Sequence, residues 1–101
     1  MIIMNMQNLM AQANKMKRDI EKTQKELESK NYEGKSQLVT AVVSGTGRLV
    51  SLNIEMDDIS SDDKEMIEDM ILVAINNAMD KMDFDKEEKL GKYGQMFNGL
   101  M

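Results

Sequence analysis

Four cationic side chains in the first third of the chain follow a helical spacing of three, four and three residues: Lys15, Arg18, Lys22 and Lys25. On an α-helix these steps place all four side chains in one stripe. A rigid row of cations suits contact with nucleic-acid phosphates, because counterion release supplies much of the affinity for that backbone. The alternative is a solvated helix face, in which the cations pair with acidic neighbours such as Asp19 and Glu21.

Other lysines extend these possibilities. Three near the stripe could enlarge a basic patch: Lys17, Lys30 and Lys35. Lys86, Lys89 and Lys92 would share one side of a C-terminal helical stretch, where Glu87 and Glu88 favour a solvated face. The net charge of −5 hides this distribution, since residues 1–37 carry seven Lys and Arg against five Asp and Glu, whereas residues 57–101 carry five against twelve.

Most catalytic chemistries lack their usual residues. The chain has no Cys and no His, which removes thiol nucleophiles, thiolate metal sites and the commonest general base. The acidic residues at 57, 58, 62 and 63 fit helix caps and partners of a helix dipole better than a cation site. Gly45-Thr46-Gly47 is interpreted as a hairpin turn, because no helix follows it. We therefore expect no enzymatic activity, cofactor, metal or small-molecule substrate.

The stripe belongs to a long predicted helix. Apolar positions recur at alternating steps of three and four, with only Thr23 off type: Met6, Leu9, Ala13, Met16, Ile20, Thr23 and Leu27. We call this set the seam; it lies opposite the cations and has heptad spacing. A helix from Met6 to Leu27 would be about 33 Å long, whereas a compact 100-residue domain has a radius of gyration of about 13 Å. The helix should therefore overhang the rest of the chain.

A β region and a second helix follow. Residues 38–44 and 48–56 predict a hairpin, with Val39, Ala41 and Val43 on one face. In the second strand, the residues predicted to share a buried face are Val50, Leu52, Ile54 and Met56. A short strand near residues 31–35 would add to the sheet.

The second helix is predicted to begin near Ser60, with capping-box spacing between Asp62 and Glu65. One apolar stripe runs along it: Met66, Ile67, Met70, Ile71, Ala74, Ala78 and Met82. Leu72, Val73 and Ile75 widen the stripe and indicate burial on more than one side. We expect a charged helical stretch to Leu90 and a mobile tail from about residue 91.

These elements predict a single domain over residues 1–101 that works as a homodimer. A lone hairpin leaves a sheet face and both sheet edges open, and the overhanging seam also needs apolar cover. Joining two copies through the sheet meets both needs, with Val50, Leu52 and Ile54 at the interface. No apolar run approaches membrane-spanning length and the N-terminus has no basic leader, so we expect a cytoplasmic protein with no membrane partner.

Three segments resemble the YbaB/EbfC family. DDKEMIEDMILVAINNAMDK (62–81) is similar to its second-helix signature, NLMAQANKMKRDIEKTQKELE (8–28) to its first helix, and LVTAVVSG with RLVSLNIEMD to its β segment. Ser36-Gln37 stands where the family usually has a Gly-rich approach, and the family's C-terminal Pro-Gly element is absent. The resemblance implies an α+β, α-β-β-β-α protomer with an antiparallel sheet, long terminal helices that project like tweezers, and dimerisation through the sheet.

The resemblance also implies binding of double-stranded DNA by a nucleoid-associated protein. We expect weak or relaxed sequence preference, with roles in chromosome organisation and gene regulation. The alternative is a protein-interaction adaptor in DNA replication or repair that uses the seam and the Met-rich faces. The third and least favoured hypothesis is a metal-dependent enzyme that uses the acidic residues at 57, 58, 62 and 63.

Overall fold

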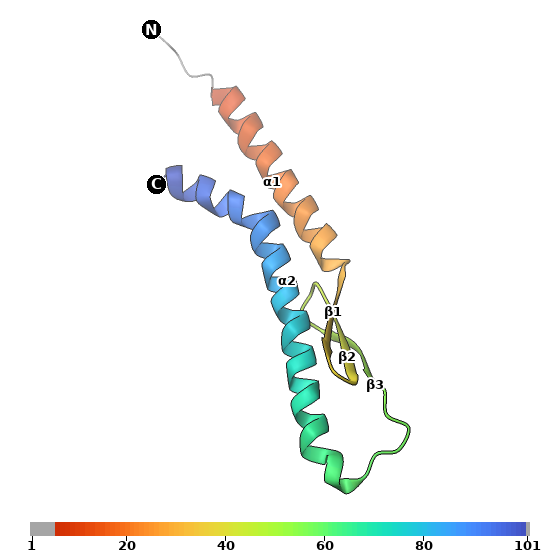
Figure 1. The fold of residues 1–101 in the computed structure, drawn as a ribbon. Helices are drawn as coiled ribbons and strands as arrows, with labels where there is room; N and C mark the ends of the chain where they lie inside the picture. Colours follow the sequence, from red (N-terminus) through yellow and green to blue (C-terminus); the bar gives the residue numbers. More distant parts are fainter. Residues whose placement is uncertain (1–5, 101) are drawn as a thin grey trace.

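The computed structural model describes residues 6–100, and side chains over residues 6–94. The elements follow in the order α1 (Met6–Glu28), β1 (Asn31–Ser36), β2 (Val39–Ser44), β3 (Leu49–Ile54), a 3₁₀ turn (Ser61–Asp63) and α2 (Lys64–Leu100). Figure 1 shows α2 lying along one face of the sheet, and α1 leaving the sheet on the same side as the C-terminal half of α2. The predicted α-β-β-β-α order is confirmed.

The sheet is antiparallel, with β2 between β1 and β3. The predicted alternation of β2 is confirmed, because Val39, Ala41 and Val43 are buried and face α2. Gly34 of β1 pairs with Ala41 and has no side chain, which lets the backbone of α2 come close at Ala74. The β1–β2 turn contains Gln37 with φ of 49°, a left-handed conformation that favours Gly over residues with a side chain.

β3 differs from the prediction of a buried, strictly alternating strand. Leu52 and Ile54 lie opposite Ala41 and Val39, so they share the face that α2 covers elsewhere. However, α2 packs chiefly over β1 and β2, and Leu52 remains 39% exposed. A register shift at Val42/Val43 places Leu49, rather than Val50, opposite Val43. Within one protomer this face is covered only in part, since Ile54 and Met56 are half-buried against the core while Val50 and Leu52 are exposed. The predicted alternation does not continue through Val50.

The capping residue that precedes α2 lies two residues earlier than predicted. The Asp63 carboxylate accepts hydrogen bonds from the backbone amide of Ser60 at 3.1 Å and from its hydroxyl at 3.3 Å. The capping pair is thus Ser60 with Asp63, not Asp62 with Glu65. The cause is the 3₁₀ turn at Ser61–Asp63, which precedes the α-helix. The capping residue therefore stands before this turn, at Ser60.

The apolar stripe of α2 packs largely as predicted. Five of its residues form the helical side of the core: Ile67, Met70, Ala74, Ala78 and Met82. Met66, Leu72 and Val73 are exposed, so burial on more than one side does not occur within a single protomer. The helix continues to Leu100, ten residues beyond the charged stretch that the sequence indicates. The mobility expected for the tail stays a prediction.

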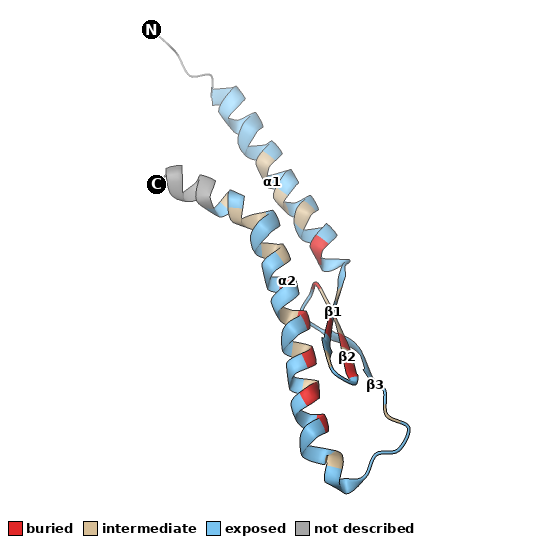
Figure 2. Cartoon of the chain, viewed as in Figure 1, coloured by how far each residue is buried: buried red, intermediate tan, exposed pale blue. Residues whose placement is uncertain are grey.

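The overhang of α1 is confirmed. The chain measures 78 × 22 × 14 Å and has a radius of gyration of 20.9 Å, well above the compact value of about 13 Å. Only Leu27 of the seam is buried; Met6 is 70% exposed and Leu9 41%. Figure 2 shows burial concentrated where α2 meets the sheet, with little along α1. No helix in the described part of the chain is long and apolar enough to cross a membrane.

Candidate nucleic-acid interface

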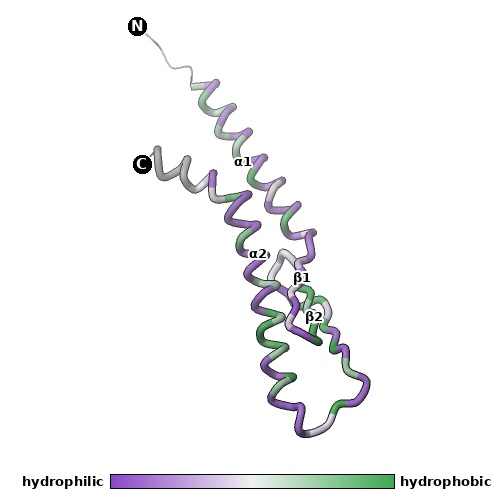
Figure 3. Tube along the Cα trace, in the orientation of Figure 1, coloured by the Kyte–Doolittle hydropathy of each residue, from purple (hydrophilic) through white to green (hydrophobic). Residues whose placement is uncertain are grey.

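The predicted basic stripe lies on the exposed side of α1. Lys15, Arg18, Lys22 and Lys25 are all exposed, and none forms a salt bridge with another described residue. The opposite side of α1 carries the seam, where Met16 and Ile20 are half-buried and Leu27 is buried. Figure 3 shows hydrophilic and hydrophobic residues alternating along α1, as expected for a two-sided helix. The helix thus carries cations on one side and apolar groups on the other, and of these apolar groups only Leu27 is buried within the protomer.

The stripe has dimensions suited to a duplex. From Lys15 to Lys25 the helix rises about 15 Å, and one strand of a duplex carries about one phosphate for each 3.4 Å of its axis. Arg18, Lys22 and Lys25 line one shallow depression together with Glu21 and Glu26. These carboxylates are close enough to soften the positive potential, so the stripe is a mixed surface with a cationic ridge.

The additional lysines lie in varied surroundings. Lys17 lines an apolar depression with Met16 and Ile20, on the seam side of α1. The ammonium of Lys35 lies 3.7 Å from the Glu33 carboxylate and is well exposed. Lys86 is half-buried between the two helices.

Lys30 and Lys89 are both engaged by one carboxylate. The Lys30 ammonium donates to Asp85 at 2.9 Å, the Lys89 ammonium at 3.2 Å, and the Tyr32 hydroxyl at 2.7 Å. Only 16% of the Asp85 side chain is exposed. We call these four residues the Asp85 cluster. No local pattern in the sequence predicts this cluster, because Lys30 and Tyr32 lie more than fifty residues from Asp85.

The cluster perturbs two pKa values. The hydrogen bond from Lys30, then that from Tyr32, holds the pKa of Asp85 far below its usual range, and Lys89 adds to the effect. Burial, followed by the hydrogen bond to the Asp85 carboxylate, raises the pKa of Tyr32 to about 12. Asp85 is therefore a carboxylate, and Tyr32 a neutral donor, across the range in which proteins normally work.

The predicted interface residues lie on the edge strand β3. Val50 is 55% exposed and Leu52 39%, while Ile54 is half-buried and packs against the core. The opposite edge of the sheet differs, because α2 side chains bond to β1 there. Asn77 donates to the carbonyl of Lys35 at 3.0 Å, and Lys81 donates to that of Glu33 at 2.6 Å. Among the described residues, no strand pairs with the outer side of β3.

These features describe a class of small α+β proteins in which a basic helix projects from a three-stranded antiparallel sheet backed by a second long helix. Residues 2–97 match the model of the YbaB/EbfC DNA-binding family, and the chain belongs to this family.

Proteins with similar sequences include several that are named as nucleoid-associated proteins. The chain is 40% identical over 93 residues to a nucleoid-associated protein of Streptococcus suis, covering 90% of this chain and 94% of that one. It is 36% identical over 99 residues to a nucleoid-associated protein of Ligilactobacillus salivarius, covering 96% and 95%. The crystal structure of uncharacterized protein HP0035 from Helicobacter pylori has the same fold, with a TM-score of 0.65 at 23% identity over 98% of this chain and 100% of that one.

Proposed function

We propose that the protein is a homodimer that binds double-stranded DNA, with the stripe on α1 contacting phosphates. The observation that carries the proposal is the row of four exposed cations without described salt-bridge partners, on the side of α1 opposite its packed residues. Free cations lose no existing ion pair when they meet a phosphate. Relatives named as nucleoid-associated proteins support a role on the chromosome. Within that role, the proposal includes chromosome organisation and gene regulation.

The proposed dimer forms through β3. Leu49, Val50 and Leu52 leave an apolar surface on this strand, at 49%, 55% and 39% exposure. The outer edge of β3 also keeps backbone groups available for another strand, whereas Asn77 and Lys81 already bond to carbonyls of β1. A long exposed apolar edge is a site for strand pairing between chains. Pairing two copies there would give one particle two basic stripes.

Sequence preference should be relaxed. Three of the four stripe residues are lysines, which act on phosphates as point charges. Phosphate contacts orient a protein on the duplex but carry no direct sequence information. We therefore expect changes in salt concentration to alter affinity more than changes in base sequence do.

The test replaces all four stripe residues with Gln and measures binding to a duplex at several salt concentrations. We expect most binding to be lost and the dimer to remain intact, because exposed substitutions usually change stability by less than about 0.5 kcal/mol each. For the wild type, the logarithm of the association constant should fall linearly with the logarithm of the salt concentration. The slope should become shallower by about 0.9 for each phosphate contact removed.

A charge-matched pair of double variants provides the control. Lys22→Gln with Lys25→Gln removes two stripe charges, and Arg48→Gln with Lys64→Gln removes two exposed charges that lie outside α1. Only the first pair should weaken binding strongly. Equal affinity and an unchanged salt slope for the stripe variant would refute DNA contact by the stripe.

The adaptor function is the second candidate, and the apolar start of α1 favours it. Met6 and Met10 are 70% and 63% exposed, and Leu9 beside them is 41% exposed. Methionine-rich surfaces adapt readily to protein partners. If the purified dimer shows no salt-sensitive duplex binding at all, this candidate takes precedence.

A further inference from the structure

The direction in which α1 projects is determined at a short junction. α1 ends at Glu28 and β1 begins at Asn31, so only Ser29 and Lys30 connect this helix to the sheet. We call α1 the arm. Two residues without tertiary contacts would leave the arm free to pivot. Lys30 is held, however, because its ammonium donates to Asp85 of α2 at 2.9 Å. The adjoining strand is tied to the same carboxylate by Tyr32, at 2.7 Å.

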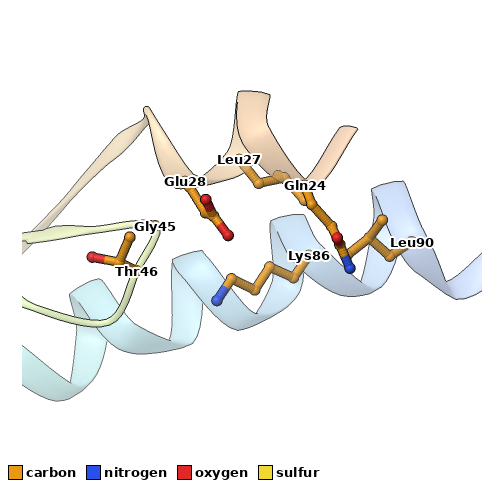
Figure 4. A pocket seen from close by; sticks show the side chains of 7 residues that line it. All are labelled: Gln24, Leu27, Glu28, Gly45, Thr46, Lys86 and Leu90. Atoms are coloured by element: carbon orange, nitrogen blue, oxygen red, sulfur yellow. The ribbon is translucent and has the colours of Figure 1, made fainter. Parts of the chain in front are cut away.

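The β2–β3 turn holds the junction from another direction. The backbone amide of Gly45 donates to the carbonyl of Lys30 at 2.9 Å. Gly45 also lies so close to the carbonyl of Leu27 that an added Cβ would overlap it. Figure 4 shows this turn next to the end of α1, with Lys86 and Leu90 of α2 below Gln24 and Leu27. The end of the arm is thus contacted by the turn and by α2.

From this geometry we infer that Asp85 is a positioning residue that holds α1, and with it the basic stripe, at a defined angle to α2. The inference rests on the proposed function, since the stripe gives the arm its purpose. Asp85 suits the task because it joins the linker, β1 and α2 through one carboxylate that is mostly shielded from solvent. A pre-oriented arm avoids part of the ordering cost when both stripes of a dimer meet one duplex.

If only net charge mattered, loss of the Asp85 carboxylate should strengthen DNA binding. Removing an acidic side chain from a protein with net charge −5 should favour binding to a polyanion. If Asp85 instead positions the arm, Asp85→Asn should weaken binding despite that gain. A fall in the correctly oriented fraction to about one third would raise the apparent Kd about threefold.

Asp83→Asn is the matched control. Asp83 lies two residues away on α2, is exposed, and has no hydrogen bond or ion pair with another described residue. Its substitution removes the same charge without touching the junction. We expect its Kd to be unchanged or slightly lower than that of the wild type.

Arm orientation is measurable without DNA. The chain has no Cys, so Glu21→Cys on α1 and Asp69→Cys on α2 introduce two unique spin-label sites. Labelled protein diluted with excess unlabelled protein reports distances within one protomer. The full-length protein should give a narrow distance distribution by pulsed electron paramagnetic resonance. Asp85→Asn should broaden or shift it, and Asp83→Asn should not.

Tyr32→Phe provides a milder test if Asp85→Asn folds poorly, because it removes one hydrogen bond and leaves Lys30 paired. It should broaden the distribution to a smaller extent. A distribution unchanged by both variants would overturn the inference, as would an Asp85→Asn affinity equal to that of Asp83→Asn. If the wild type does not bind DNA, the proposed function fails, and the distance measurement still decides whether Asp85 orients the arm.

Discussion

Replacing Gly34 with Ala tests how closely α2 docks on the sheet. A Cβ at this position would overlap the carbonyl oxygen of Ala74 and the backbone amide nitrogen of Ala78. These atoms belong to the backbone of a hydrogen-bonded helix and cannot rotate away as a side chain would. The overlap can be relieved only if α2 moves away from β1, so the substitution acts on the whole core.

The magnitude follows from two opposing effects. Adding a group to a well-packed core costs about 1–3 kcal/mol. A gap of about 0.5–1 Å loses about a quarter to a half of each dispersion contact, and Val39 and Ala41 beneath α2 are fully buried. Against this cost, Ala restricts the unfolded chain and offsets about 0.4–1 kcal/mol. We therefore expect Gly34→Ala to lower the free energy of unfolding by about 1–2 kcal/mol.

Urea denaturation followed by circular dichroism measures this loss, at one protein concentration because the stability of a dimer depends on concentration. The midpoint should fall while the slope m stays unchanged. Gly94→Ala is the control, since a Cβ there meets no atom within 4 Å. It should be neutral or slightly stabilising, because Ala favours a helix over Gly by up to about 1 kcal/mol. A Gly34→Ala variant as stable as the wild type would show that α2 does not dock as described.

Two further predictions concern the interface and pH. Light scattering at micromolar concentration should return twice the 11.5 kDa chain mass. Leu52→Asp should give the monomer mass or unfold the chain, because an unpaired carboxylate buried in the dimer interface is costly. Ser51→Asp, on the other face of β3, should remain dimeric. Stability should fall below about pH 4, where the unfolded Asp85 carboxylate takes up a proton, and above about pH 10, where unfolded Tyr32 loses one. Urea midpoints across pH should show both losses reduced in Asp85→Asn; equal pH profiles would contradict the coupling.

Local periodicity is enough to predict the two helices and the buried face of the central strand. Heptad spacing predicted α1 from Met6 to within one residue of its end at Glu28. Alternation predicted the buried face of β2, and the apolar spacing of α2 predicted its core residues from Ile67 to Met82. These patterns are readable because a side chain's direction repeats every 3.6 residues in a helix and every two in a strand.

Which of those faces becomes covered depends on how the elements pack against one another. β3 has the alternation of a buried strand, yet α2 packs chiefly over β1 and β2, so Leu52 remains exposed. A periodic pattern reports that a face is apolar, but it carries no information about what will lie against it.

Packing between distant elements also determines which lysines form ion pairs. Lys30 and Lys89 have the same chemistry as Lys22, but docking of α2 brings Asp85 to them and leaves Lys22 in solvent. Lys30 and Asp85 are 55 residues apart. A pairing of that kind depends on where α2 meets the sheet, and this docking is set by the packing of Ala74 and Ala78 against Gly34 rather than by any spacing along the chain.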